Sequence, residues 1–304
     1  MRILITGSTG YIGRRVVASL LEVMPEAEIV ALCRDVDKAD RLCHSKRCIN
    51  VSVNDMAHFV PQFAPQLVLH LATLSTSSDD TDIIQPIIDT NITFGVRLLD
   101  ILSTTNSLRL FVNVGSFAEY RNGLNAGQHD AYLYTATKSA FRHFVEYYSA
   151  KCGFKHITTV PYTVYGGNDT AKKLMDYMVE SATAIEPVKM TAGEQILDFV
   201  HVDDIVRFFV NVALAANDEL RFQLLADGEE FHLGTGVGTK VRHLADIISD
   251  KMGVPLNIEW GGRPYRPLDV MYAVAPIKTN SIFFNWHANI TLSQGLNLML
   301  GEGK

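Results

Sequence analysis

The feature that most constrains the fold is a short run of glycines near the N-terminus. Gly7, Gly10 and Gly13 lie at three-residue spacing, directly after the apolar segment 2–6, and the amphipathic segment 11–24 follows them. Glycines at such a junction permit a tight turn, let the backbone approach a ligand, and let a helix pack closely on a strand. The sequence therefore predicts a strand–turn–helix unit whose helix N-terminus can bind an anion.

The remainder of the first half alternates short apolar runs with segments of helical periodicity. Such alternation indicates a parallel sheet with helices on both faces. The apolar runs are uninterrupted, as expected for strands that are buried on both faces. We expect strands at residues 2–6, 28–33, 67–72, 110–114 and 156–160, and helices at residues 11–24, 91–103 and 134–151.

This regular alternation ends after residues 165–167. Residues 168–190 are interpreted as a separate helical unit, residues 199–216 as an apolar helix, and residues 230–233 as another strand. We predict an α/β fold, a Rossmann-type doubly wound parallel sheet with a smaller C-terminal α/β substrate lobe. The predicted domains are residues 1–165 and 199–237 for the dinucleotide-binding part, and residues 166–198 and 238–304 for the substrate-binding lobe.

Composition excludes several classes of protein. A net charge of −6 opposes a role as a nucleic-acid scaffold. No apolar run approaches the ~18 residues needed to cross a bilayer, and the N-terminus lacks the pattern of a signal peptide. Cys43 and Cys48 flank His44, but no second pair at ligand spacing follows, so we expect free thiols and no metal. The expectation is a cytoplasmic protein that binds neither nucleic acid nor membrane.

The end of the second predicted strand carries Arg34 and Asp35. Dinucleotide-binding folds place an acid there for the adenosine ribose hydroxyls, or an arginine for a 2′-phosphate. Arg14 follows the last glycine of the turn, and two guanidinium groups near one site favour phosphate. NADP(H) is therefore the favoured cofactor, while Asp35 leaves NAD(H) possible.

Tyr134 and Lys138 form a second motif, at the start of a long predicted helix. Four-residue spacing puts both side chains on one helix face. Because an ammonium stabilises a nearby phenolate, we expect the pKa of Tyr134 to fall from near 10. Such a tyrosine can exchange a proton with a carbonyl or carbinol oxygen. Ser116 follows the predicted strand 110–114, at the sheet edge where ligands bind, and can hydrogen-bond the same oxygen.

With these residues in view, the chain resembles the extended short-chain dehydrogenases/reductases, the NAD(P)-dependent nucleotide-sugar epimerase/dehydratase/reductase family. The resemblance covers nearly the whole chain and implies hydride transfer at a sugar joined to a nucleoside diphosphate, in a homodimer packed through the helices at 91–103 and 134–151. It rests on residues 6–13, 70–72, 89–91, 116, 134 with 138, 162–166, 193–195, 198–204 and 265–269.

The resemblance also implies roles for individual residues. The implied catalytic residues are Ser116, Tyr134 and Lys138. The implied cofactor-binding residues are Gly7, Thr9, Gly10, Tyr11, Ile12, Arg34, Leu71, Ala72, Asn91, Tyr134, Lys138 and Thr163. The implied substrate-binding residues are Thr73, Ser116, Phe117, Tyr134, Arg263 and Arg266, the last in a segment that reaches the substrate diphosphate.

One departure from the family's sequence pattern disfavours one of the family's reactions. The 4,6-dehydratases carry an Asp-Glu pair directly after the catalytic hydroxyl residue, where this chain has Phe117 and Ala118, so dehydration is disfavoured. A reductase consumes NADPH at each turnover, so Arg34 favours reduction. We expect NAD(P)H-dependent reduction of the 4-keto group of a nucleoside-diphosphate 4-keto-6-deoxysugar, with the proton from Tyr134. An NAD-dependent 4-epimerase and a non-catalytic dinucleotide-sensing protein are the alternatives.

Overall fold

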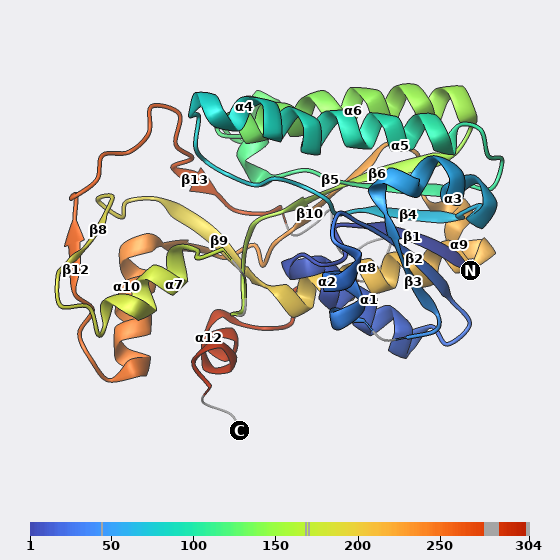
Figure 1. Ribbon diagram of the computed structural model, residues 1–304. Helices are drawn as coiled ribbons and strands as arrows, with labels where there is room; N and C mark the ends of the chain where they lie inside the picture. The colour runs from blue at the N-terminus through green and yellow to red at the C-terminus, as the bar shows by residue number, and fades with distance from the viewer. Residues whose placement is uncertain (44, 168, 170, 277–285, 302–304) are drawn as a thin grey trace.

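The computed structural model describes residues 1–43, 45–167, 169, 171–276 and 286–301. Its largest feature is a seven-stranded parallel sheet of order β10-β6-β5-β4-β1-β2-β3 (Figure 1). The strands are β1 (Arg2–Thr6), β2 (Glu28–Cys33), β3 (Cys48–Ser52), β4 (Leu67–His70), β5 (Leu110–Val114), β6 (Lys155–Pro161) and β10 (Glu229–Leu233). The predicted Rossmann-type sheet is confirmed.

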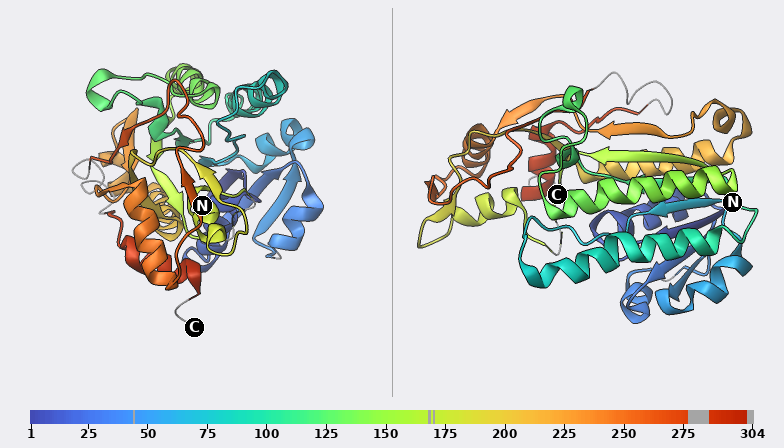
Figure 2. Two further views of the ribbon diagram at one scale, coloured as in Figure 1. Left: turned by 90° about the vertical axis from the view of Figure 1, so that its left-hand side faces the viewer. Right: turned by 90° about the horizontal axis from the view of Figure 1, so that it is seen from above.

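Helices cover both faces of this sheet because successive side chains of a strand point to opposite faces. Ile3 and Ile5 of β1 pack in one apolar cluster with α1 (Tyr11–Val23) and α8 (Val202–Asn217), whereas Leu4 packs in the opposite cluster. That opposite cluster draws on α3 (Met56–Phe63), α5 (Phe94–Leu102) and α6 (Leu133–Cys152), and Figure 2 shows α5 and α6 side by side. All three β1 side chains are fully buried, which explains the uninterrupted apolar run.

A smaller group of elements lies beyond the carboxyl ends of the sheet strands (Figure 1). Its apolar core includes Met178, Leu244 and Leu296, all fully buried. Its elements are β7 (Thr163–Tyr165), α7 (Leu174–Ser181), β8 (Val188–Met190), β9 (Ile196–His201), β11 (Gly238–Lys240), α10 (Val241–Met252), β12 (Ile258–Trp260), β13 (Tyr272–Ala273) and α12 (Leu292–Leu300). The predicted domain limits stay a prediction, and β9 crosses the limit at residue 199.

Some elements differ from the sequence interpretation. The predicted helical unit at 168–190 contains α7 but ends in β8, which pairs in parallel with β12; residues 168 and 170 lie outside the described residues. With three residues, β8 is too short to show the alternation of apolar and polar residues that identifies a strand. Its partner β12 lies some seventy residues further along the chain. The sequence interpretation also omitted β3, α3 and α2 (Val36–Leu42).

Two further observations concern membranes and metals. Within the described ranges, no helix has the length and apolarity that a membrane span requires. The four cysteines are free, and the described part of the chain contains no group of three or more His, Cys, Asp or Glu residues able to hold a metal ion. His44 lies outside the described residues.

A buried carboxylate joins the seven-stranded sheet to the smaller sheet formed by β11, β9, β13 and β7. Asp198 of β9 is fully buried and accepts hydrogen bonds from the backbone of Gly236 (2.8 Å) and Ala275 (3.1 Å). It also accepts from the backbone N–H (2.9 Å) and hydroxyl (2.6 Å) of Thr235. Thr235 and Gly236 follow β10 of the main sheet, whereas Ala275 follows β13. Asp198 therefore fixes the smaller sheet against the larger one.

Asp198→Ala should lower the free energy of unfolding by about 3 kcal/mol, because it leaves the buried Ala275 N–H and the half-buried Thr235 and Gly236 N–H groups without an acceptor. Urea titration followed by circular dichroism measures this loss. Asp246→Ala, at an exposed position of α10, is the matched control and should unfold close to wild type. Equal stability of the two variants would contradict the structural role of Asp198.

Candidate functional site

The glycine turn between β1 and α1 packs against the loop that follows β4. Gly7 has a φ of +70°, and a Cβ at this position would lie 2.7 Å from the backbone nitrogen of Ala72. Neither the conformation nor the space is available to a larger residue. The backbone N–H of Gly10 donates to the carbonyl of Gly7 at 3.0 Å and closes the turn. The turn therefore lies next to residues 71 and 72, as the predicted site requires.

The first turn of α1 is open to an anion. Gly10 is the N-cap residue, no side chain caps the helix, and its first turn carries no acid. The hydroxyl of Ser8 is buried without a hydrogen-bond partner among the described residues. Unpaired N–H groups, the positive end of the helix dipole and an unpaired hydroxyl are what a diphosphate needs. The residues of this turn fit the diphosphate of a dinucleotide.

A cavity of about 280 Å³ opens beside this turn. Thr9 and Arg14 are among its lining residues, and its apolar walls come from α1, β2 and α2. Arg34 and Asp35 are both exposed where β2 ends. The Asp35 carboxylate accepts the backbone N–H of Lys38 at 2.8 Å and caps α2. Asp35 thus has a structural partner in its own helix.

Tyr134 and Lys138 lie in the first two turns of α6. The Lys138 ammonium is 5.9 Å from the centre of the Tyr134 ring, and Lys138 is 2% exposed. The side chains of Thr73 and Ser75, in the loop after β4, lie near enough to the Tyr134 phenol to act on its pKa. The structure therefore brings Tyr134, Lys138 and Thr73 together. Ser75 was not anticipated from the sequence.

The electrostatics of this pair differ from the expectation. Burial raises the pKa of Tyr134 to about 12, against the lowering effect of Thr73 and Ser75, and the Glu119 charge adds to the rise. Burial lowers the pKa of Lys138 to about 8. The prediction that Lys138 brings the pKa of Tyr134 below 10 is therefore wrong for the chain by itself. Desolvation of the phenolate outweighs the attraction of an ammonium 5.9 Å away.

Ser116 follows β5 and caps the 3₁₀ turn η3 (Phe117–Glu119). Its hydroxyl accepts the backbone N–H of Ala118 at 3.3 Å, and its own N–H donates to the Glu119 carboxylate at 2.5 Å. The Phe117 ring stacks on Tyr162, with 5.7 Å between ring centres. Ser116 and Phe117 thus lie at the carboxyl edge of the sheet, where the sequence interpretation expected them.

Asn91 lies in the π-helical turn η2 (Asp89–Thr93), between α4 (Thr81–Ile88) and α5. Its amide oxygen accepts from the backbone of Leu74 (2.7 Å) and the hydroxyl of Thr73 (3.2 Å). Its amide nitrogen donates to the Leu74 carbonyl (3.2 Å) and the Thr137 hydroxyl (2.9 Å). Since all four positions of the amide are used, Asn91 ties the loop after β4 to α6. Its contact with a cofactor stays a prediction.

The two predicted substrate arginines have different contacts. Arg266 has its guanidinium 5.8 Å from the ring centre of Tyr132, two residues before Tyr134. The Tyr132 hydroxyl donates to Asp269 at 2.6 Å, and Asp269 accepts the Arg266 backbone N–H at 3.1 Å. Arg263 is anchored instead to β8, through its backbone N–H and the Met190 carbonyl. The structure therefore brings the Arg266 guanidinium to the start of α6. The Arg263 backbone is bonded to β8 instead.

The other predicted cofactor residues line the same edge of the sheet. Their contacts with a cofactor stay predictions. They are Thr9, Tyr11 and Ile12 at the turn and the start of α1, Leu71 and Ala72 after β4, and Thr163 in β7.

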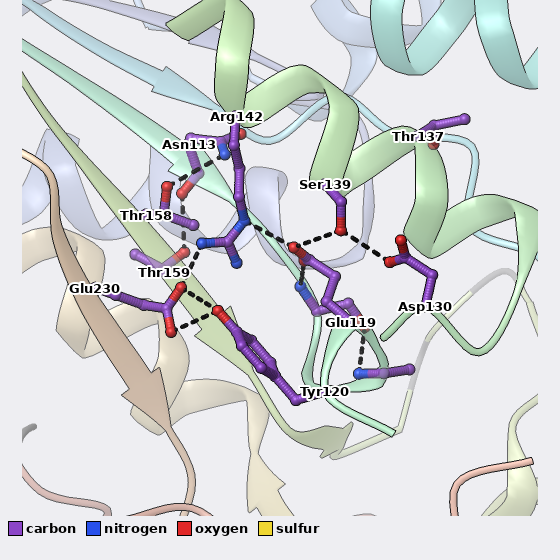
Figure 3. A network of polar contacts seen from close by, with 12 residues as sticks. Asn113, Glu119, Tyr120, Asp130, Thr137, Ser139, Arg142, Thr158, Thr159 and Glu230 are labelled. Carbon is purple, nitrogen blue, oxygen red and sulfur yellow. Dashed lines mark hydrogen bonds and ion pairs between the residues drawn. The ribbon is translucent and has the colours of Figure 1, made fainter. Parts of the chain in front are cut away.

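An ion-pair network behind Ser116 was missed from the sequence (Figure 3). Arg142 of α6 donates to Glu119 through Nε at 2.7 Å and to Glu230 of β10 through Nη1. Glu230 also accepts the Tyr120 hydroxyl at 2.6 Å. The available signal was spacing, since Arg142 follows Lys138 by four residues and shares its helix face. A second cation on a face that packs on a sheet requires buried partners.

Comparison with known proteins identifies relatives across most of the chain. The sequence profile of the NAD dependent epimerase/dehydratase family matches residues 3–223. A CDP-abequose synthase of Yersinia pseudotuberculosis is 26% identical over 272 residues, which cover 89% of this chain and 91% of the relative. The CDP-abequose synthase of Salmonella typhimurium is 25% identical over 309 residues, with 98% and 97% covered.

Solved structures share the fold. A UDP-glucose 4-epimerase of Thermotoga maritima, solved with UDP-glucose, superposes with a TM-score of 0.81 at 22% identity, covering 99% of this chain and 98% of that one. A UDP-glucuronic acid 4-epimerase of Bacillus cereus, solved with UDP-glucuronic acid and NAD, gives 0.84 at 18% identity and the same coverage. The resemblance to extended short-chain dehydrogenases/reductases is confirmed. With its profile matched over well more than half of its length, the chain belongs to the NAD dependent epimerase/dehydratase family.

Proposed function

We propose that this protein uses NADPH to reduce the 4-keto group of a nucleoside-diphosphate 4-keto-6-deoxysugar. The proposal rests on one arrangement, the Tyr134 phenol beside a buried Lys138 and near the loop after β4, which also packs against a glycine turn that fits a dinucleotide. Relatives named CDP-abequose synthase and structural neighbours solved with NAD and nucleotide sugars support the same class of substrate and cofactor.

A bound nicotinamide dinucleotide would supply the hydride that reduces the sugar carbon. The first-turn N–H groups of α1 and the Ser8 hydroxyl would hold its diphosphate. The Tyr134 phenol donates a proton to the sugar oxygen as the keto group is reduced, and the Ser116 hydroxyl hydrogen-bonds the same oxygen. Lys138 orients the cofactor ribose and stabilises the phenolate that remains.

The protonation state of Tyr134 is the one that reduction of a keto group needs. With a pKa of about 12, the phenol keeps its proton at neutral pH. Reduction of a keto group needs this protonated form, because the nascent alkoxide must receive a proton. Epimerisation starts from a hydroxyl and needs a base in the same place. The protein by itself therefore holds the proton that a reductase uses.

The end of β2 favours NADPH. Asp35 caps α2, which engages the acid that would otherwise bind the adenosine ribose hydroxyls. Arg34 is exposed beside it, and Arg14 lines the adjacent cavity. Both guanidinium groups suit a 2′-phosphate. We therefore assign a preference for NADPH over NADH to Arg34 and Arg14.

The substrate lobe favours a nucleoside diphosphate. Arg266 lies beside the N-terminus of the catalytic helix, and the Tyr132–Asp269 hydrogen bond holds its loop there. Phe117 and Ala118 supply no acid next to Ser116, which opposes dehydration of the sugar. We also expect a homodimer through α5 and α6, where Phe144 and Tyr147 are exposed.

The direct test is incubation with NADPH and a panel of CDP-, GDP- and dTDP-linked 4-keto-6-deoxysugars. Loss of NADPH absorbance, with a product heavier by one hydride and one proton in mass spectrometry, is the expected result. Copurified NAD⁺ and interconversion of nucleotide sugars without NADPH consumption would support a 4-epimerase. NADPH binding without turnover of any keto sugar or nucleotide sugar would support a sensing protein.

Tyr134→Phe should reduce kcat at least ~100-fold, since it removes the proton donor and leaves the ring in place. NADPH should still bind, as measured by fluorescence titration. Tyr177→Phe, at an exposed position on α7, removes a phenol hydroxyl away from the site and should keep wild-type kcat. Retained turnover in the Tyr134→Phe variant would remove Tyr134 from the mechanism.

The rate of reduction should fall as the pH rises through about 8. Burial lowers the pKa of Lys138 to that value, so the ammonium is charged below it and neutral above it. Loss of the charge weakens stabilisation of the Tyr134 phenolate formed during turnover. Measuring kcat across the neutral and alkaline pH range tests this fall in rate. A flat profile up to the intrinsic pKa of lysine would contradict this role.

Arg34→Ala should raise the Kd for NADPH by roughly tenfold or more, because a charged hydrogen bond to phosphate contributes about 1.5–3 kcal/mol. The Kd for NADH should change little. Arg41→Ala, an exposed arginine of α2, controls for net charge. Equal weakening of NADPH and NADH would show that Arg34 does not read the 2′-phosphate.

A further inference from the structure

Charged side chains are gathered in the protein interior behind Ser116 (Figure 3). Glu119 is fully buried, Lys138 is 2% exposed and Arg142 is 9% exposed. Glu230, at the outer end of the group, retains 25% side-chain exposure. Burying ions is unfavourable unless they are paired and hydrogen-bonded, so the arrangement needs an explanation beyond packing.

Glu119 contacts two elements that carry predicted catalytic residues. One carboxylate oxygen accepts the backbone N–H of Ser116 at 2.5 Å. The other accepts Nε of Arg142 at 2.7 Å, with the hydroxyl of Ser139 more distant at 3.4 Å. Both oxygens are therefore engaged inside the protein, and Glu119 is not placed to exchange a proton with a substrate. It connects the end of β5 to the helix of Tyr134 and Lys138.

The Glu119–Arg142 pair packs directly against the backbone that precedes Ser116. A Cβ on Gly115 would lie 2.6 Å from Oε1 of Glu119 and 2.7 Å from Nη2 of Arg142. Any side chain at this position would displace the ion pair or the strand end. The glycine thus lets a charged pair approach the turn that carries Ser116.

We propose that Glu119 is a positioning residue of the active site, whose carboxylate fixes the backbone of Ser116 relative to α6, the helix that carries Tyr134 and Lys138. Arg142 and Glu230 hold that carboxylate in place. The inference rests on the proposed function, which supplies the roles of Ser116 and Lys138.

The charges around Lys138 support this assignment. Burial lowers the pKa of Lys138, the Glu119 carboxylate raises it, and Arg142 on the same helix lowers it. His70 of β4 also faces Lys138, but burial lowers the pKa of His70 to about 3, so this ring is neutral at working pH. Tyr134 keeps its proton in the same range. Burial raises the pKa of the Glu119 carboxyl, and the Arg142 guanidinium, the Ser116 N–H and Lys138 lower it. Held as a carboxylate by the Arg142 ion pair, Glu119 is the attractive charge that opposes desolvation of Lys138.

The variants Glu119→Gln and Glu230→Gln form a matched pair. Each removes one carboxylate charge from Arg142 and keeps the shape of the side chain. Of the two, only Glu119 accepts the Ser116 N–H and raises the pKa of Lys138. Glu230 instead accepts the Tyr120 hydroxyl and contacts His232 at 2.7 Å. A purely structural role for the ion pair predicts similar effects of both substitutions. The positioning role predicts a difference.

The primary measurement is a pH titration of the full-length protein labelled with ¹³Cε-lysine, with the Lys138 resonance assigned from a Lys138→Met spectrum. In Glu119→Gln the titration of Lys138 should move down by at least about one pH unit, which corresponds to losing one close favourable charge. In Glu230→Gln it should stay within about half a unit of wild type. An unshifted Lys138 in folded Glu119→Gln would overturn the proposal.

A second variant covers the case in which Glu119→Gln does not fold. Glu119→Asp keeps the charge and shortens the reach, so Lys138 should titrate near its wild-type pH while kcat for keto-sugar reduction falls about tenfold, because Ser116 loses its fixed partner. A shifted titration with undiminished kcat in this variant would overturn the proposal.

The NMR titration needs no turnover, so the two hypotheses can fail separately. If Tyr134→Phe is inactive as expected and Lys138 does not respond to Glu119→Gln, only the inference about Glu119 is wrong. If Tyr134→Phe keeps its turnover, the proposed function is wrong, whatever Lys138 does.

Discussion

Burial of the polar face of α6 is the constraint on which the site depends. Phe141 and Val145 pack in the apolar cluster under one face of the sheet and anchor the helix there. The same packing takes Lys138 and Arg142, on neighbouring turns, out of water. A buried cation has to find a partner inside the protein, and Glu119 provides one from the end of β5. The packing of α6 on the sheet therefore also sets the charges of the site, because the contact that buries Phe141 and Val145 buries Lys138 and Arg142 as well.

Desolvation acts on both members of the tyrosine–lysine pair, in opposite directions along the pH scale. It favours the neutral phenol of Tyr134 and the neutral amine of Lys138, so their pKa values move apart, to about 12 for the phenol and about 8 for the amine. Spacing along a helix reveals that two such groups are neighbours, but it does not reveal how much water they keep. Because the sequence does not reveal this loss of water, it predicted a lowered pKa for Tyr134. In the folded chain the pKa of Tyr134 is raised, and the phenol retains its proton.

Local patterns predicted the fold well because its defining features are local. Strands covered on both faces are uninterrupted apolar runs, and the glycine turn brings a strand and a helix together within a few residues. The contacts that the sequence did not reveal join residues far apart in the chain. The Tyr132 hydroxyl bonds to Asp269, and the Arg142 guanidinium bonds to Glu230. These partners are far apart in the sequence, and no periodic pattern links them. The positions of Ser116, Tyr134 and Lys138 could be predicted, but their buried partners could not.

The end of β2 shows how the fold gives different contacts to a neighbouring acid and base. Arg34 and Asp35 are adjacent, and from the sequence alone either one could decide the cofactor. In the folded chain, Asp35 accepts the N–H of Lys38 three residues ahead, so its charge is placed at the positive end of α2 and partly offset by it. Arg34 has no place in that cap and its side chain is exposed. Capping thus engages the acid in α2, which is why the proposed function assigns the cofactor 2′-phosphate to the arginine.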